Sequence, residues 1–186
     1  MKKVIKYSFF LFVFSVVLYS CGSAPEEREN SFSLQVGTMN YEELMANIQY
    51  KGVELYDDVD EKILSPFSMT PQRKLEIVVV NGAMLGISGG DFTYNYLCET
   101  ALRSGMKICP PEVAFHIALQ EIHIPKLTAS RSIGIAMHPI KDVYGRNYIF
   151  ALGEHFTDEA ITIGAQTIDE ENPRYHPNDP FFIFCR

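Results

Sequence analysis

A glycine-rich segment carries the residues most suggestive of catalysis in this sequence. Gly86, Ser88 and Gly90 match the pattern G-x-S-x-G of a nucleophilic serine, and they lie between an expected strand and an expected helix, where phosphate loops also lie. A nucleotide-binding loop requires a lysine and a serine or threonine directly after its last glycine, and these residues do not follow Gly90. A nucleophile elbow also needs a histidine partner and a larger parallel sheet than this chain predicts. A break in the chain is therefore the preferred interpretation, and catalysis by Ser88 is the alternative.

The histidines offer a second route to acid–base or metal chemistry. His116 and His123 are seven residues apart on a segment expected to form a strand, so they face opposite sides and cannot bind one metal ion. His138 and His176 each precede a proline, and no H-x-H or H-E-x-x-H motif occurs. No metal site and no cofactor is expected. Some carboxylates can act as acids, but surface positions explain them equally well: Glu112, Glu121 and Asp142.

An acidic run at 57–61 contains four carboxylates and invites a calcium interpretation. A calcium loop of the EF-hand type needs glycine at its sixth position and glutamate at its twelfth, but Lys62 and Ser68 are there. We therefore predict a solvated acidic turn.

The beginning of the chain resembles the signal peptide of bacterial lipoproteins. Its positive start contains Lys2, Lys3 and Lys6. An almost unbroken apolar run at 8–18 follows and is too short to span a bilayer comfortably. The tetrapeptide LYSC at 18–21 resembles a lipobox, and small residues, Ser20 and Gly22, flank Cys21. We expect cleavage before Cys21 and acylation of its side chain, which anchors the protein to a membrane. The alternatives are an ordinary cleaved signal with a coincidental cysteine, or an uncleaved anchor.

Length and charge limit the class of protein further. Removal of 1–20 from the 186 residues leaves 166, and loss of three lysines changes the formal net charge from −7 to −10. This size favours one domain. The negative charge, without a basic cluster, excludes nucleic acid as an expected partner and leaves membrane attachment to the acyl chains. We predict a flexible, polar tether at 21–38 and a single domain at 39–186.

Three cysteines remain when Cys21 is acylated. Cys98 and Cys109 can form a disulfide between a helix and the loop after it, which leaves Cys185 unpaired. The alternative is that all three are small buried side chains. A catalytic thiol is less favoured, because Glu112, close to Cys109, would raise the pKa of the thiol.

Two helices follow from caps and apolar periodicity. Asn40 can cap a helix through Tyr50 that places Leu44 and Ile48 on one face. Asp91 can cap a second helix, which Gly105 ends. The apolar stripe of this second helix comprises Tyr94, Leu97, Cys98, Ala101 and Leu102. Cys98 is therefore expected to point toward the core.

Strands are expected in the remainder of the domain. The β-branched run at 75–80 reads as a buried strand, with a helix beginning at Pro71 as the alternative. Five more segments have strand patterns: 116–122, 132–140, 148–155, 160–167 and 181–185. Short loops between consecutive strands favour antiparallel pairing. The predicted fold is α+β, with one or two helices packed on a mainly antiparallel, roughly five-stranded twisted sheet.

Several segments resemble a family of small bacterial proteins of uncharacterised function. The matching segments are LEIVVV at 75–80, GMKICPPEV at 105–113, IGIAMHPIKDVYG at 133–145 and FFIF at 181–184. The sequence departs from the pattern at His138, where an acidic residue is expected, and it lacks a tryptophan expected near the last strands. The resemblance implies one compact domain and brings no mechanism with it.

These patterns together favour a membrane-anchored lipoprotein of the bacterial cell envelope. Its domain is expected to be a non-enzymatic binding or structural module, whose partner, a protein or a small molecule, the patterns do not identify. The alternative is a small hydrolase or ligand-binding domain that uses Ser88, Cys109 or His116.

Overall fold

The computed structural model describes residues 31–56, 59, 68–124, 132–154, 161–169, 172 and 174–186. The predicted lipobox with Cys21, the tether up to residue 30 and the four carboxylates of the 57–61 run lie outside these residues. The described strands are β1 (Ser31–Val36), β2 (Arg73–Val80), β3 (Ser132–Ile135), β4 (Ile140–Lys141), β5 (Asn147–Glu154), β6 (Ile161–Ile168) and β7 (Phe181–Cys185). The described helices are α1 (Tyr41–Lys51), α3 (Tyr94–Arg103) and α4 (Val113–Leu119).

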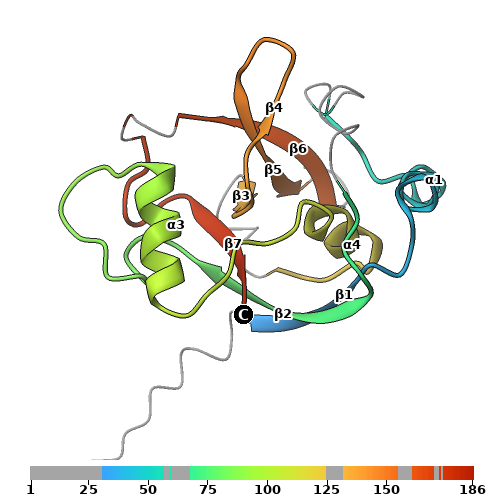
Figure 1. Cartoon of the computed structure of the whole chain (residues 1–186), viewed down its shortest axis with the longest axis horizontal. Helices are drawn as coiled ribbons and strands as arrows, with labels where there is room; N and C mark the ends of the chain where they lie inside the picture. The colour runs from blue at the N-terminus through green and yellow to red at the C-terminus, as the bar shows by residue number, and fades with distance from the viewer. Residues whose placement is uncertain are drawn as a thin grey trace, which may run out of the picture.

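The described strands form one mixed sheet of α+β type (Figure 1). The strand order is β1-β2-β7-β3-β5-β4. The strands β3 and β4 pair with different parts of one edge of β5, and β6 pairs with the opposite edge. All pairs are antiparallel except β3 with β7, which is parallel. The prediction of a mainly antiparallel sheet is therefore confirmed, although the described part of the chain has seven strands and three helices instead of about five strands and one or two helices.

The sheet curls around α4. This short helix contacts β1 at one end of the strand order and β5 and β6 at the other end. A flat sheet cannot bring both of its ends to one helix. The twisted sheet of this protein therefore coils into a partial barrel (Figure 1). All seven residues of α4 are buried, and Phe115 packs edge-on against Phe150 of β5, with ring centroids 5.1 Å apart.

The other two helices lie on opposite sides of this body (Figure 1). The predicted cap of α1 is confirmed: Asn40 accepts a hydrogen bond from the Glu43 amide, and the Glu43 carboxylate accepts one from the Asn40 amide. In α3 the cap is Thr93 instead of Asp91, because the Thr93 hydroxyl accepts from the Tyr96 amide.

The predicted strand at 116–122 is wrong, because His116 lies within α4. The helix is apolar all round except for His116, so the period that separates a helix from a strand is absent from its sequence. The predicted strand at 132–140 is in fact two strands, β3 and β4, with residues 136–139 between them.

The predicted tether also ends earlier than expected. Residues 31–36 form β1, which pairs antiparallel with β2 from Ser31 opposite Val78 to Val36 opposite Arg73. Leu34 and Val36 are fully buried. Ser33 and Gln35 alternate with these buried residues in a period-2 pattern, so the folded domain already includes Ser31–Val36 and does not begin at residue 39.

Candidate functional site

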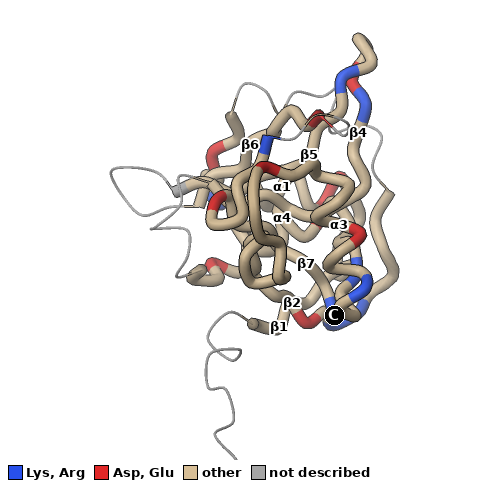
Figure 2. The backbone as a smooth tube through the Cα atoms, turned by 90° about the vertical axis from the view of Figure 1, so that its left-hand side faces the viewer, with Lys and Arg blue, Asp and Glu red and all other residues tan. Residues whose placement is uncertain are grey.

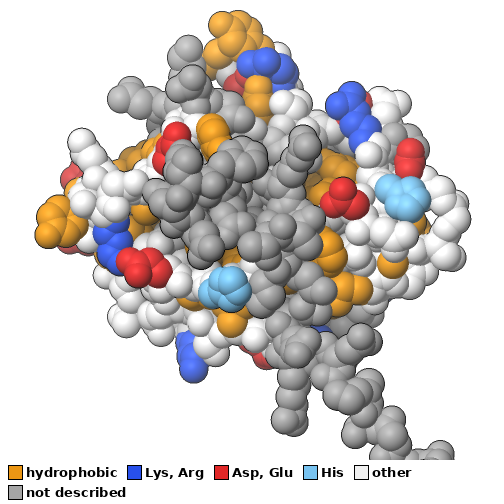
Figure 3. Space-filling model, turned by 180° about the vertical axis from the view of Figure 1, so that it is seen from behind, with side chains coloured by type: hydrophobic (Ala, Val, Ile, Leu, Met, Phe, Trp, Pro, Cys, Tyr) orange, Lys and Arg blue, Asp and Glu red, His pale blue; other side chains and the backbone are white. Residues whose placement is uncertain are grey.

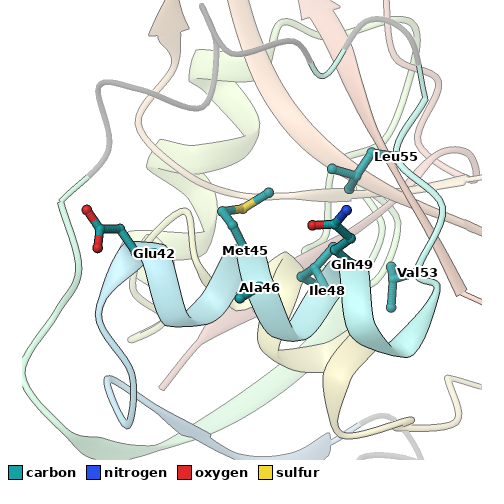
Figure 4. Close-up of a pocket in the computed structure, with 7 residues that line it drawn as sticks. All are labelled: Glu42, Met45, Ala46, Ile48, Gln49, Val53 and Leu55. Carbon is teal, nitrogen blue, oxygen red and sulfur yellow. The ribbon is translucent and has the colours of Figure 1, made fainter.

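An open apolar groove runs along α1 and the segment that follows it (Figure 4). Its volume is about 590 Å³, which is within the range of ligand pockets. The lining residues are Glu42, Met45, Ala46, Ile48, Gln49, Val53 and Leu55. Ile48 is buried at the floor, whereas Met45, Val53 and Leu55 remain half-buried. Figure 4 shows Met45 and Gln49 extending from the helix toward Leu55, with Glu42 near the beginning of the helix.

The local sequence explains how the groove forms. Gly52 adopts a φ of 67°, in the left-handed region that glycine tolerates, and ends α1 so that the chain turns back. The returning segment then pairs with the outer edge of β6: the Ile163 amide donates to the Glu54 carbonyl at 3.0 Å, and the Tyr56 amide donates to the Ile163 carbonyl at 3.0 Å. Leu55 is thereby held beside the helix face that Met45 occupies.

The side chain of Lys51 connects the C-terminal end of α1 to α4. The Lys51 Nζ donates to the Leu119 carbonyl at 2.9 Å and to Glu121 Oε1 at 2.7 Å. This contact lowers the pKa of the Glu121 carboxyl, chiefly through the hydrogen bond and the charge of Lys51. The wall of the groove is therefore attached to the core helix and not only to the chain on either side of it.

The hairpin between β4 and β5 is a second exposed apolar feature. Val143 is 68% exposed and Tyr144 is 78% exposed at its tip. The hairpin projects from the top of the body (Figure 1), and Figure 3 shows hydrophobic side chains at the top of the molecule above Lys and Arg side chains. The two basic residues of the hairpin are Lys141 and Arg146.

This tip is preorganised although it is exposed. Asp142 accepts hydrogen bonds from the amides of Tyr144 and Arg146, each at 2.9 Å, and forms an ion pair with the Arg146 guanidinium at 2.7 Å. The guanidinium carbon also lies 5.4 Å from the ring centroids of Tyr144 and Tyr148. The hydrogen bonds and the charge of Arg146 outweigh desolvation and lower the pKa of the Asp142 carboxyl. A tip held in this way loses little conformational entropy when it binds.

A buried acid lies at the N-cap position of α4, and a buried imidazole lies in the middle of the helix. Glu112 and His116 are both fully buried and are one helical turn apart. Glu112 Oε1 accepts hydrogen bonds from the Thr70 amide at 3.0 Å and from the Thr70 hydroxyl. Glu112 Oε2 and both ring nitrogens of His116 have no hydrogen-bond partner among the described residues. Burial lowers the pKa of His116, and the Glu112 charge opposes this effect only partly. His116 is therefore favoured in its neutral form.

The residues named for the alternative hydrolase are not assembled into a catalytic site in the described part of the chain. Ser88 is exposed, His116 is fully buried and Cys109 is oxidised in a disulfide. No hydrogen bond joins Ser88 to a histidine among the residues that the structure describes. Cys109 therefore lacks the thiolate that nucleophilic chemistry needs, and His116 is out of reach of solvent.

The predicted disulfide between Cys98 and Cys109 is wrong. Cys109 pairs with Cys185, with a Cα–Cα distance of 5.3 Å, and Cys98 is not disulfide-bonded. The reason lies in the residues after α3: Lys107 pairs antiparallel with Cys185, through amide-to-carbonyl bonds in both directions, and this pairing brings Cys109 beside β7. Cys98 instead packs on the core surface from the half-buried face of α3.

Sequence reasoning missed both exposed features. For the groove, the signal was Met45, which continues the apolar face of the predicted helix, together with Val53 and Leu55, which alternate with a polar residue directly after the helix. For the hairpin, the signal was two apolar residues, Val143 and Tyr144, inside a segment that otherwise has the composition of a turn.

Comparisons with protein-family models, with curated proteins and with solved structures found no match to this chain. None of the helices in the described ranges is long and apolar enough to cross a bilayer. The same ranges contain no group of three or more His, Cys, Asp or Glu side chains placed to hold a metal ion. The exposed apolar surfaces of the groove and the hairpin tip are the features on which the functional proposals rest.

Proposed function

We propose that the protein is a lipoprotein of the bacterial cell envelope, acylated on Cys21, whose domain binds an apolar ligand in the α1 groove. The groove is the observation that carries this proposal. Half-buried Met45, Val53 and Leu55 expose apolar surface to solvent in one continuous depression, and such surface is stabilised when a ligand covers it.

The disulfide supports the location. Cys109 and Cys185 are each 2% exposed and close a loop across 76 residues of sequence. Structural disulfides persist in oxidising compartments outside the cytosol, such as the bacterial periplasm. This agrees with export directed by the lipoprotein-type signal that ends at Cys21.

Replacement of the acylated cysteine tests the anchor. In cells that express Cys21→Ala, we expect the protein to leave the membrane fraction or to accumulate as an unprocessed precursor. Labelled palmitate should enter the wild-type chain and not the variant. Equal incorporation of palmitate into both chains would contradict acylation at this position.

A neutral apolar dye tests the groove. We expect Nile red to bind the Cys21→Ala mature chain saturably, because this chain offers the groove without acyl chains that would also take up the dye. Ala46→Arg places a long charged side chain in the groove and should weaken binding about tenfold. Asn47→Arg, one residue further on the exposed side of the same helix, is the matched control and should bind as the parent does. Equal loss in both variants, or no loss in either, would contradict the proposal.

A further inference from the structure

We infer that the occupant of the α1 groove is the β4–β5 hairpin tip of a second copy of this chain. The inference rests on the proposed function of the groove and adds its partner. It assigns Val143 and Tyr144 as the inserted side chains. Contacts of this kind, between two different surfaces of one protein, are heterologous and join copies head to tail.

The two surfaces cannot meet within one molecule. In Figure 1 the hairpin projects from the top of the body, whereas α1 lies at its right-hand side. Four hydrogen bonds from backbone amides, one from Arg146 Nε and the ion pair between Arg146 and Asp142 hold the tip in this position. A hairpin fixed in this direction can enter only the groove of another copy.

Charge at the two surfaces is complementary. Lys141 is exposed at the base of the hairpin, and Figure 2 shows Lys and Arg positions along this projection. The rim of the groove carries Glu42, which is exposed in the first turn of α1. With a formal net charge of −10 after removal of 1–20, whole copies of the chain repel one another, whereas the hairpin, in which Lys141 and Arg146 outnumber Asp142, is attracted by an acidic groove rim.

The small size of the contact points to assembly on a membrane. Insertion of Tyr144 into the groove buries about 150–250 Å² of its surface, far below the roughly 800 Å² that each partner of a stable complex buries. The contact is therefore weak between copies in solution. Anchors that confine both copies to one surface raise their effective concentration toward about the millimolar range, where a weak contact becomes populated.

The dimensions of the molecule argue against the bilayer as the partner of the hairpin. The strand β1, which begins at Ser31, lies at the bottom of the body in Figures 1 and 2, and the hairpin lies at the top. A body from Ser31 to Arg186 has a diameter of about 39 Å for its length. The ten peptide links from Cys21 to Ser31 span about 35 Å only when fully extended, and about 17 Å when relaxed. The anchor thus holds the tip away from its own membrane.

Energy transfer between copies tests this inference on the full mature chain. Lipidated chains with a donor or an acceptor fused to the C-terminus are placed in vesicles of phosphatidylethanolamine and phosphatidylglycerol. We expect transfer above the level set by random surface density. Tyr144→Ser in all copies, or Ala46→Arg in all copies, should abolish this excess. The control is Tyr96→Ser, which removes another exposed tyrosine, from α3, and should leave the excess transfer unchanged.

A mixture of the two variants gives the decisive result. Tyr144→Ser copies keep the groove and Ala46→Arg copies keep the tip, so one contact per pair remains and transfer should return in the mixture. A mixture that stays at the random level, or loss of transfer in Tyr96→Ser as well, overturns the inference. If Nile red still distinguishes Ala46→Arg from Asn47→Arg in that case, the groove remains a binding site and only its assigned occupant is wrong.

Discussion

Two halves of the molecule differ in how their buried polar side chains are hydrogen-bonded. In the half built on α3 and β7, the Tyr94 hydroxyl donates to the Met137 carbonyl at 2.7 Å and accepts from the Met137 amide at 2.9 Å. In the half built on α1 and α4, both ring nitrogens of His116 have no partner among the described residues. Both side chains are almost completely buried, at 2% and 0% exposure, so burial alone does not distinguish them.

This difference agrees with the proposed location of the binding site. The α3 half also holds the disulfide, and its polar contacts fix one arrangement of the chain. The α1–α4 half exposes an apolar groove and buries polar atoms that have no hydrogen-bond partner among the described residues. Proteins depart from the usual separation of polar and apolar groups mainly at functional sites, so we assign binding to the α1–α4 half and structural support to the other.

Removal of the disulfide should have the largest effect on the free energy of unfolding. Cys185→Ser opens a loop across 76 residues, for which the chain-entropy model predicts a loss of about 4.5 kcal/mol. Cys98→Ser, in the same half, should change the value by less than about 1 kcal/mol. Urea unfolding of both variants measures the contrast. Equal losses, or a thiol label on Cys109 and not on Cys98 in the non-reduced wild type, would contradict the pairing.

The Tyr94 hydroxyl should contribute the next largest effect. Tyr94→Phe leaves the amide and the carbonyl of Met137 without this partner inside the core, which costs about 1–3 kcal/mol. The control is Tyr96→Phe on the same helix, because Tyr96 is 47% exposed and its hydroxyl can bond to water. Urea midpoints that shift by the same amount in both variants would show that the buried hydroxyl has no special role.

At neutral pH the smallest effect on the free energy of unfolding is expected at His116, whose contribution depends on pH. Its pKa is lowered in the folded protein from 6.5, so below pH 6.5 the unfolded chain binds a proton that the folded chain does not. The stability contribution is complete above pH 6.5 and falls as the pH decreases toward the folded pKa, by about 1.4 kcal/mol per pH unit at most. His116→Leu should flatten this slope and change the stability at pH 7.5 by less than about 1 kcal/mol.

Unfolding at pH 7.5 and 5.5 measures this slope. His123→Leu is the control, because His123 is exposed beyond the end of α4 and its replacement should leave the slope as it is. If His116→Leu keeps the wild-type slope, or lowers stability as much as Tyr94→Phe does, the buried imidazole is hydrogen-bonded in the folded protein and the contrast with Tyr94 is wrong.

The parts of the fold that the sequence predicts are those that local residues determine. The strands β2 and β7 follow from VVV and FFIF bounded by turn residues, and α1 follows from the Asn40 cap and its apolar face. The helix α4 is buried on every side, so its sequence lacks the periodicity that identifies a helix. Its assignment depends on the curled sheet that encloses it.

The features that form the site depend on distant pairings instead. The disulfide follows from the bridge between Lys107 and Cys185, and the groove follows from the bridge between Leu55 and Ile163. Each bridge joins segments far apart in the chain, and no spacing of residues encodes it. The hairpin tip, by contrast, has a local signal in Val143 and Tyr144 within a turn, which sequence reasoning missed, and the exposure of these side chains is seen only in the structure.

A photo-crosslinking residue placed in α1 tests the assignment of binding to the α1–α4 half most directly. The full-length chain carries the crosslinker at position 46, inside the groove, or at position 47, on the exposed side of the same helix. Irradiation of intact cells should give a discrete, high-yield adduct from position 46 and little from position 47. Equal yields from the two positions, or adducts from position 47 alone, would contradict the assignment of the groove as the binding site.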